Sequence, residues 1–147
     1  MRAVVTRVSS ASVEINSTVT GKIEQGFLVL LGIKTGDTET DSVKLASKIC
    51  TLRVFADSEG KMNLDLESVG GSILVVSQFT LYADCKSRRP GFTASARPET
   101  AIPLYELFID TCKKAGFKVE TGSFGAMMNV SSVNDGPVTI LFDTESF

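Results

Sequence analysis

Short apolar runs separated by turn residues make up most of the chain, and they predict a protein rich in β-strands. Residues 3–8 and 12–15 are rich in β-branched side chains and partly alternate with polar ones, which is typical of half-buried strands. Residues 27–33 are apolar on both faces and therefore predict a central strand. The remaining short runs also predict strands, at residues 19–23, 62–66, 72–78, 117–120, 127–133 and 138–142.

Two longer segments have their apolar residues at helical spacing. The first helix is predicted to start within residues 37–41, which contain capping residues and acids. The second covers residues 98–115, and the lysines and glycine at its end suit the last turn and the position after it. Because proline is disfavoured inside a helix, Pro103 allows either a start at Pro98 or a regular helix that begins only at Ile102.

The order of these elements predicts the fold class. Strands, a helix, more strands, a second helix and final strands indicate an α+β fold, with a mixed or antiparallel, barrel-like β-sheet covered by two α-helices. The order disfavours a doubly wound nucleotide-binding fold, and the chain has no glycine-rich phosphate-binding motif. At 147 residues the chain is most simply a single domain, covering residues 1–147.

Composition excludes several classes of catalysis. The chain contains no histidine, which removes Ser-His-Asp and Cys-His catalysis, histidine metal ligands and the usual near-neutral general base. Cys50, Cys85 and Cys112 have no short metal-ligand spacing, so we expect reduced, mostly buried thiols, no metal and no cofactor. No apolar run reaches the roughly 18 residues of a membrane helix, and no signal peptide is evident, so the cytosol is the expected compartment.

Polar side chains follow the predicted strand at residues 72–78. Strand alternation would place Ser77 and Phe79 on one face and Gln78 and Thr80 on the other. This segment is either a frayed polar edge or a site built on a rigid strand. A nucleophilic Thr80 would need an activating base, and none is evident nearby in the sequence. A site that positions a labile bond, with backbone N–H groups stabilising an oxyanion, requires fewer side chains.

Two further features have both a structural and a functional interpretation. Gly136 and Pro137 lie between two predicted strands and form either a hairpin turn or a bare stretch of backbone that a ligand can approach closely. Residues 85–98 contain no acid and form either a solvated loop or a patch that contacts phosphates. The net charge of −2 gives no general attraction to nucleic acid. The basic residues of this stretch are Lys86, Arg88, Arg89 and Arg97.

Residues 77–83 (SQFTLYA) and 134–139 (NDGPVT) together resemble the two signature motifs of the D-aminoacyl-tRNA deacylases, also called D-tyrosyl-tRNA deacylases. The likeness extends over nearly the whole chain, with similar length and motif spacing. Further segments that share it are residues 1–5, 28–32, 60–64, 89–92, 119–122 and 124–126. Three positions depart from the usual pattern outside the motifs, namely Gly91, Met127 and Ser132.

The resemblance implies a cytosolic, homodimeric esterase that binds the 3′ end of aminoacyl-tRNA. Such an enzyme frees D-amino acids from tRNA and also clears glycine from the wrong tRNA. In the family the Gly-Pro bond is cis and reaches into the active site of the partner subunit, a role that here falls to Gly136 and Pro137. Their carbonyl groups would hold the substrate α-amino group so that an L side chain would point into the backbone.

The same resemblance places Ser77, Gln78, Phe79 and Thr80 around the scissile ester. Thr80 is then either a nucleophile or a positioning residue, with the 2′-hydroxyl of the terminal adenosine assisting, and the lack of histidine favours the second role. The basic stretch would contact the tRNA through Lys86, Arg88 and Arg89. Two other functions stay open: a catalytically silent RNA- or aminoacyl-binding module on the same fold, and a small metal-free hydrolase of another ester.

Overall fold

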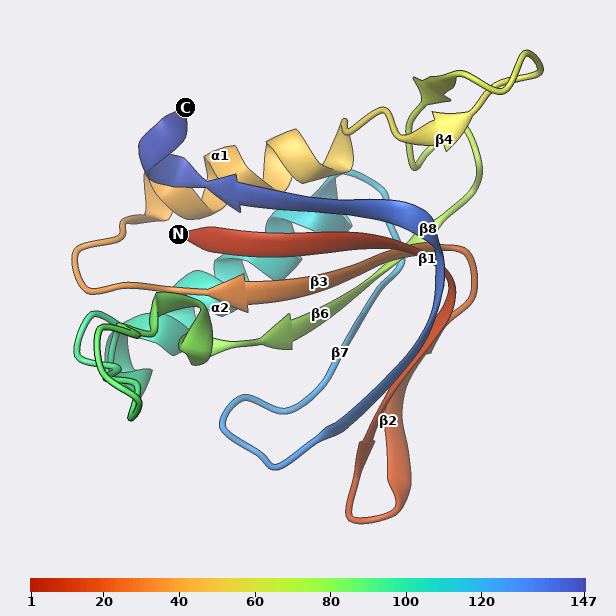
Figure 1. Cartoon of the computed structure of the whole chain (residues 1–147). Helices are drawn as coiled ribbons and strands as arrows, with labels where there is room; N and C mark the ends of the chain where they lie inside the picture. The colour runs from red at the N-terminus through yellow and green to blue at the C-terminus, as the bar shows by residue number, and fades with distance from the viewer.

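A mixed six-stranded β-sheet forms the frame of the protein (Figure 1). The computed structural model describes every residue from Met1 to Phe147. The long strand β1 pairs with β2, β3 and β8 in antiparallel fashion, and parallel pairing continues the sheet from β3 to β6 and β7. These strands are β1 (Arg2–Ile15), β2 (Thr18–Ile23), β3 (Gly26–Gly32), β6 (Ser72–Ser77), β7 (Val119–Thr121) and β8 (Asn129–Asp143).

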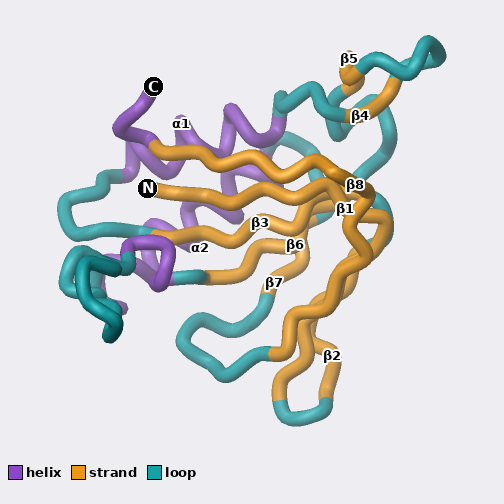
Figure 2. The backbone as a smooth tube through the Cα atoms, viewed as in Figure 1, coloured by secondary structure: helices purple, strands orange, loops and turns teal.

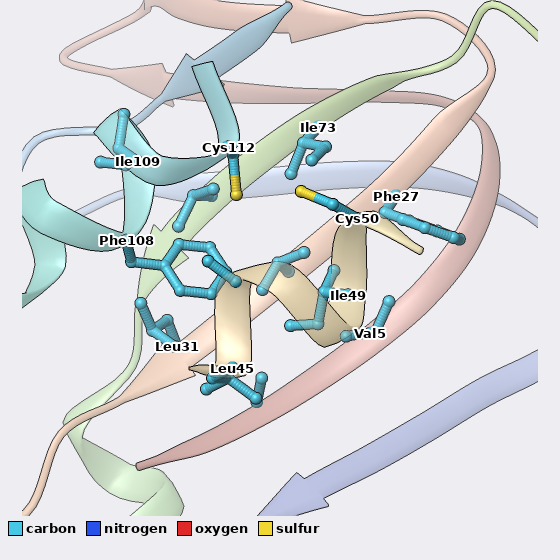
Figure 3. Close-up of a cluster of buried hydrophobic side chains, with 14 of the residues drawn as sticks. Val5, Phe27, Leu31, Leu45, Ile49, Cys50, Ile73, Phe108, Ile109 and Cys112 are labelled. Atoms are coloured by element: carbon cyan, nitrogen blue, oxygen red, sulfur yellow. The ribbon is translucent and has the colours of Figure 1, made fainter. Parts of the chain in front are cut away.

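Two helices, α1 (Glu39–Cys50) and α2 (Pro98–Lys114), cover one face of this sheet (Figure 1). Their apolar stripes and the inner face of the sheet enclose the main core, in which Phe27 and Phe108 are fully buried. Figure 3 shows Cys50 and Cys112 pointing toward each other in this core, from the last turns of the two helices. All three cysteines are free thiols, and only Cys85 is exposed.

The sheet curls strongly, which creates a second, smaller core on its other side. This core contains residues of β1, β2, β3 and β6, among them Val13, Ile23 and Leu74. The strand β2 lies close to β7 there, so that the sheet is nearly closed. The predicted α+β class, with a barrel-like sheet and two covering helices, is confirmed. Neither helix combines the length and the apolar character that crossing a bilayer requires.

The second helix begins at the earlier of its two predicted starts. Pro98 is the first helical residue, where the missing N–H of proline has no intrahelical partner to lose. Pro103 lies inside α2 and removes one N–H from the hydrogen-bond ladder of the helix. Burial of the apolar stripe, which includes Leu104 and Phe108, continues across this position and holds the helix in one piece.

A small hairpin stands away from the main sheet at one end (Figure 2). Its strands are β4 (Phe55–Ala56) and β5 (Met62–Leu64), which pair only with each other. The expected edge strand at residues 62–66 is therefore present but shorter. Two single turns of 3₁₀ helix complete the fold, η1 (Phe79–Tyr82) and η2 (Thr144–Ser146).

The strand β8 runs through Gly136 and Pro137 without reversing direction. The prediction of two strands joined by a hairpin turn at this point is wrong. In the pairing of β1 with β8, Thr6 faces Thr139 and Val8 faces Asn134, so residues 135–138 stand opposite Arg7 alone. Such a bulge leaves residues outside the hydrogen-bond ladder, which is why proline is tolerated in the middle of the strand.

The hairpin between β1 and β2 offers a simple test of the fold. Its two loop residues, Asn16 and Ser17, both have positive φ angles, of 48° and 62°. Because glycine adopts this conformation at lower cost than serine, we expect Ser17→Gly to raise the free energy of unfolding by about 0.5–1 kcal/mol. Thermal melts should show this as a rise of about 1–4 °C.

The matched control is Ser58→Gly, which changes an exposed turn residue without a positive φ angle. There glycine only increases the freedom of the unfolded chain, so the melting temperature should fall slightly. A lower melting temperature for Ser17→Gly than for the parent protein would contradict the assigned hairpin geometry.

Candidate active site

The segment after β6 forms a tight turn over the end of β3, and we call residues 78–82 the site turn. The Gln78 N–H donates to the carbonyl of Leu31 at 2.8 Å, and the Leu81 N–H donates to the carbonyl of Gln78 at 3.2 Å. The chain therefore leaves the strand at Ser77 and enters η1. The predicted strand alternation from Ser77 to Thr80 is wrong, because the parallel ladder with β3 ends at Leu31 and Ser77.

Gln78 and Thr80 nevertheless meet, as the alternation had suggested. The side-chain amide of Gln78 donates to the Thr80 hydroxyl oxygen at 2.5 Å. The amides of Phe79 and Thr80 are the first two of η1 and have no partner inside that turn. The site turn therefore presents a hydroxyl and two backbone N–H groups, a set that suits the stabilisation of an oxyanion.

No general base accompanies the Thr80 hydroxyl. Its only side-chain partner is the amide of Gln78, which does not accept protons at ordinary pH. Tyr82 follows in the same turn, but it is buried, and burial raises the pKa of its phenol well above the usual value. Tyr82 thus stays protonated, and the site turn holds no group that would activate a threonine nucleophile.

A hollow of about 600 Å³ opens beside the site turn. Ser77, Gln78 and Phe79 line it, whereas Thr80 is exposed next to it. None of its lining residues is charged, and most are apolar. Its other walls come from β3, the start of α2 and the segment before β8, and include Ile33, Ala101, Phe124 and Met128. The hollow is suited to a flat or apolar group rather than to an ion.

Phe92 and Ser95 also border this hollow, and neither of them was predicted from the sequence to belong to the site. The Phe92 ring meets the ring of Phe79 edge to face, with ring centres 5.1 Å apart. The Ser95 hydroxyl donates to the carbonyl of Phe79 at 2.8 Å. The loop that carries the basic residues is thus attached to the site turn. The presence of an aromatic residue, Phe92, within the polar stretch 85–98 could have indicated from the sequence that this loop packs on the site.

Gly136 and Pro137 are exposed in the bulge of β8, and the peptide bond between them is cis. Arg7 holds this bulge in place from β1. Its Nε donates to the carbonyl oxygen of Asp135 at 3.0 Å and lies 3.1 Å from the Asp135 carboxylate. Its guanidinium also donates to the carbonyl of Val54. Sequence reasoning missed Arg7, although a single charge within an apolar strand marked it.

Within one chain the two predicted halves of the site are apart. Gly136 and Pro137 stand opposite Arg7 on the β8 side of β1. The site turn packs on Gly32, which pairs with Arg2 on the other side of β1. Figure 1 shows η1 and the bend of β8 at different ends of the sheet. One protomer therefore offers a site turn with a hollow, and separately an exposed stretch of backbone.

The comparison with known proteins supports the resemblance seen in the two motifs. A profile of the D-Tyr-tRNA(Tyr) deacylase family matches residues 4–143. The chain belongs to this family. It is 55% identical to a D-aminoacyl-tRNA deacylase of Thermosipho africanus (strain TCF52B), over 99% of this chain and 98% of that one. It is 56% identical to one of Thermus aquaticus, over 98% of this chain and 95% of that one.

Solved structures share the fold of this deacylase-family chain. One, described as c-Myc DNA Unwinding Element Binding Protein, has a TM-score of 0.91 and 38% identity, covering 97% of this chain and 98% of its own. Another, described as a probable eukaryotic D-amino acid tRNA deacylase, has a TM-score of 0.80 at 17% identity, covering 96% and 97%, and shows the fold alone.

The basic residues of this deacylase-family chain lie in the loop that leads from the site turn to Phe92 and Ser95. Lys86, Arg88 and Arg89 are all exposed. Lys86 lies 3.6 Å from the carboxylate of Asp84, whereas Arg88 and Arg89 form no ion pair. The loop is closed at its base by paired hydrogen bonds between Asp84 and Gly91. Two free guanidinium groups are thus presented next to the site turn, where they are available to phosphates.

The strand β8 of the deacylase-family chain also exposes large apolar side chains. Val133 is 60% exposed and Leu141 is 68% exposed, on either side of Gly136 and Pro137. Met127, just before the strand, is 92% exposed. Isolated exposed apolar side chains are common in proteins, but Val133 and Leu141 lie on the same strand as the exposed backbone of Gly136 and Pro137.

Proposed function

We propose that this protein hydrolyses the ester bond of D-aminoacyl-tRNA, releases free tRNA and the D-amino acid, and leaves L-aminoacyl-tRNA intact. The identity of 55–56% to D-aminoacyl-tRNA deacylases over nearly the whole length of both chains carries this proposal. Clearance of glycine from mischarged tRNA belongs to the same proposal, as does action in the cytosol. The site turn and its hollow supply groups that suit the reaction.

The proposed chemistry depends on positioning rather than on an activated side chain. Water adds to the ester carbonyl carbon, and the backbone amides of Phe79 and Thr80 stabilise the negative charge on its oxygen. The bond to the ribose 3′ oxygen then breaks, and this oxygen takes up a proton. The 2′-hydroxyl of the terminal adenosine, next to both oxygens, assists the proton transfer. The absence of a base beside Thr80 supports this route.

Selection between D and L substrates is assigned to Gly136 and Pro137 of a partner subunit. Their carbonyl oxygens would accept hydrogen bonds from the substrate α-amino group and so fix the orientation of the α-carbon. An L side chain would then meet backbone atoms, whereas a D side chain or the hydrogen of glycine would avoid them. The exposure of both residues leaves their carbonyl groups available for this role.

A homodimer follows from the same proposal. Within one chain the site turn and Gly136–Pro137 lie on opposite sides of β1, so a second copy must supply one of the two halves. The exposed apolar residues Val133 and Leu141 flank Gly136 and Pro137 on β8, which makes this strand a suitable contact surface.

Thr80→Ala separates the two roles considered for the hydroxyl. If Thr80 only helps to position the ester, its loss removes one hydrogen bond, and kcat should fall by about 10-fold at most. Removal of a nucleophile would instead cost on the order of 10⁶ in kcat. Single-turnover rates with D-Tyr-tRNA measure the difference. Abolished turnover in a folded Thr80→Ala protein would overturn the positioning role.

Replacing Arg88 and Arg89 by alanine should weaken tRNA binding and reduce its dependence on salt. Each lost phosphate contact should lower the slope of log Kd against log salt concentration by about one unit. Replacing Lys113 and Lys114 at the end of α2, which are also exposed, is the matched control and should leave the slope unchanged. An unchanged slope in the arginine variant would remove this loop from the RNA surface.

Turnover distinguishes the proposed enzyme from the two alternatives. Purified protein, with EDTA present because no metal is expected, is incubated with D-Tyr-tRNA, and the released tyrosine is followed with time. We expect many turnovers per site. Binding of D-Tyr-tRNA without release of tyrosine would support a catalytically silent module instead. Hydrolysis of a simple activated ester but not of D-Tyr-tRNA would support a hydrolase with another substrate.

A further inference from the structure

We propose that Gly32, the last residue of β3, is a positioning residue that sets the orientation of the site turn. The proposal rests on the proposed function, because it concerns the same ester hydrolysis. Gly32 does not line the hollow, and it acts through the two residues of the site turn that pack on it, Gln78 and Leu81.

The site turn lies directly on the Cα atom of Gly32. A Cβ atom at this position would be 2.9 Å from the Cβ of Leu81 and 3.0 Å from the carbonyl oxygen of Gln78. Real Cβ atoms essentially never approach other atoms more closely than 3.0 Å. Any side chain at residue 32 must therefore displace the turn or the end of β3.

The backbone conformation does not explain why glycine occupies this position. Gly32 has no positive φ angle and continues the antiparallel pairing of β3 with β1, opposite Arg2. Gly36, a few residues later, shows the opposite case, since its φ is 95° and no atom lies within 4 Å of its potential Cβ. Glycine is therefore needed at residue 32 for a steric reason, because the site turn occupies the space that a Cβ atom would fill.

A displacement here would reach the reacting groups directly. The carbonyl of Gln78 accepts the N–H of Leu81 and so forms the first hydrogen bond of the turn. Between these two residues lie the amides of Phe79 and Thr80 and the Thr80 hydroxyl. A push on both ends of this short segment rotates the two amides together. Relief of these contacts requires a shift of a few tenths of an ångström. Because misplacement by about 1 Å costs about 100-fold in rate, we expect this smaller shift to cost between about 10-fold and 100-fold.

Gly32→Ala is the direct test. We expect kcat for D-Tyr-tRNA to fall by about 10–100-fold, while KM changes less than about threefold, because most residues that line the hollow lie outside the site turn and Arg88 and Arg89 stay exposed. Amide NMR signals of Phe79 and Thr80 should shift, and those of β2 should not. A folded Gly32→Ala protein with the kcat of the parent would overturn the proposal.

Gly21→Ala is the matched control. Its Cβ would lie 2.6 Å from the carbonyl oxygen of Thr121, an even tighter contact than at Gly32, between β2 and β7 and away from the site turn. It should lower the melting temperature as Gly32→Ala does, but keep kcat. An equal loss of kcat in both variants would show that general destabilisation is the cause and would contradict the proposal.

A second variant covers the case in which Gly32→Ala does not fold. Leu81→Ile adds a branch at the Cβ that faces Gly32 and pushes on the same contact from the other side. It should also lower kcat more than KM, and an unchanged kcat would count against the proposal. If the parent protein does not hydrolyse D-Tyr-tRNA, the proposed deacylase function is wrong. If the parent is active and the variants keep its kcat, only the positioning role of Gly32 is wrong.

Discussion

Replacing Gly136 with alanine is expected to lower the hydrolysis of D-Tyr-tRNA by about 100-fold, while the protomer stays folded. A Cβ on Gly136 would meet only the backbone nitrogen of Val138 in its own chain, at 3.7 Å, which is ordinary contact. The added methyl group therefore has no cost within the protomer. It acts only on what approaches the bulge from outside, which in the proposed dimer is the substrate α-amino group.

The measurement is kcat/KM for D-Tyr-tRNA, with the melting temperature recorded for the same preparation. Gly91→Ala is the control, because Gly91 has no positive φ angle and its potential Cβ also has open space around it. That variant should keep the activity of the parent protein. Full activity in Gly136→Ala would show that substrate does not approach this backbone.

Val133→Asp is expected to produce a monomer and to reduce deacylation by more than 100-fold. Val133 is 60% exposed on β8, close to Gly136, so a charge there should oppose the packing of a second copy. If the proposed dimer is correct, the site turn stays intact in the monomer but loses Gly136 and Pro137 of the partner subunit. Activity and dimer should therefore disappear together, because losing the residues that position the substrate lowers the rate of deacylation by about 100-fold or more.

Sedimentation and activity assays over a range of protein concentrations test this link. Val19→Asp is the matched control, because Val19 is 55% exposed on β2, which β1 separates from β8. It should remain dimeric and active. A Val133→Asp protein that is monomeric and fully active would show that one chain holds a complete site.

The sequence predicted those features that depend on local periodicity. The apolar run at residues 27–33 indicated a central strand, and β3 lies between β1 and β6 in the sheet. Capping residues before the first helix were also read correctly, since Thr38 caps α1 and exchanges hydrogen bonds with Asp41. These signals are short-range, and the residues that carry them are neighbours in the chain.

Features that depend on long-range register were not predicted. Asn-Asp-Gly followed by proline is a common hairpin signal, and only the pairing of β8 with β1 shows that residues 135–138 bulge out opposite Arg7. In the same way, the alternation expected from Ser77 to Thr80 failed because the ladder with β3 ends, which the local sequence does not reveal. The two segments of the candidate site were recognised from the sequence, but their conformations depend on pairing with strands that are distant in the chain, β1 and β3.

The ratio of D- to L-tyrosine released from tRNA tests the central claim most directly. Equal amounts of D-Tyr-tRNA and L-Tyr-tRNA are mixed with the protein in one tube, and the free tyrosine is resolved on a chiral column over time. The account predicts that D-tyrosine appears, while L-tyrosine is released no faster than in the absence of protein. Release of both enantiomers at the same rate, or of neither, would contradict it.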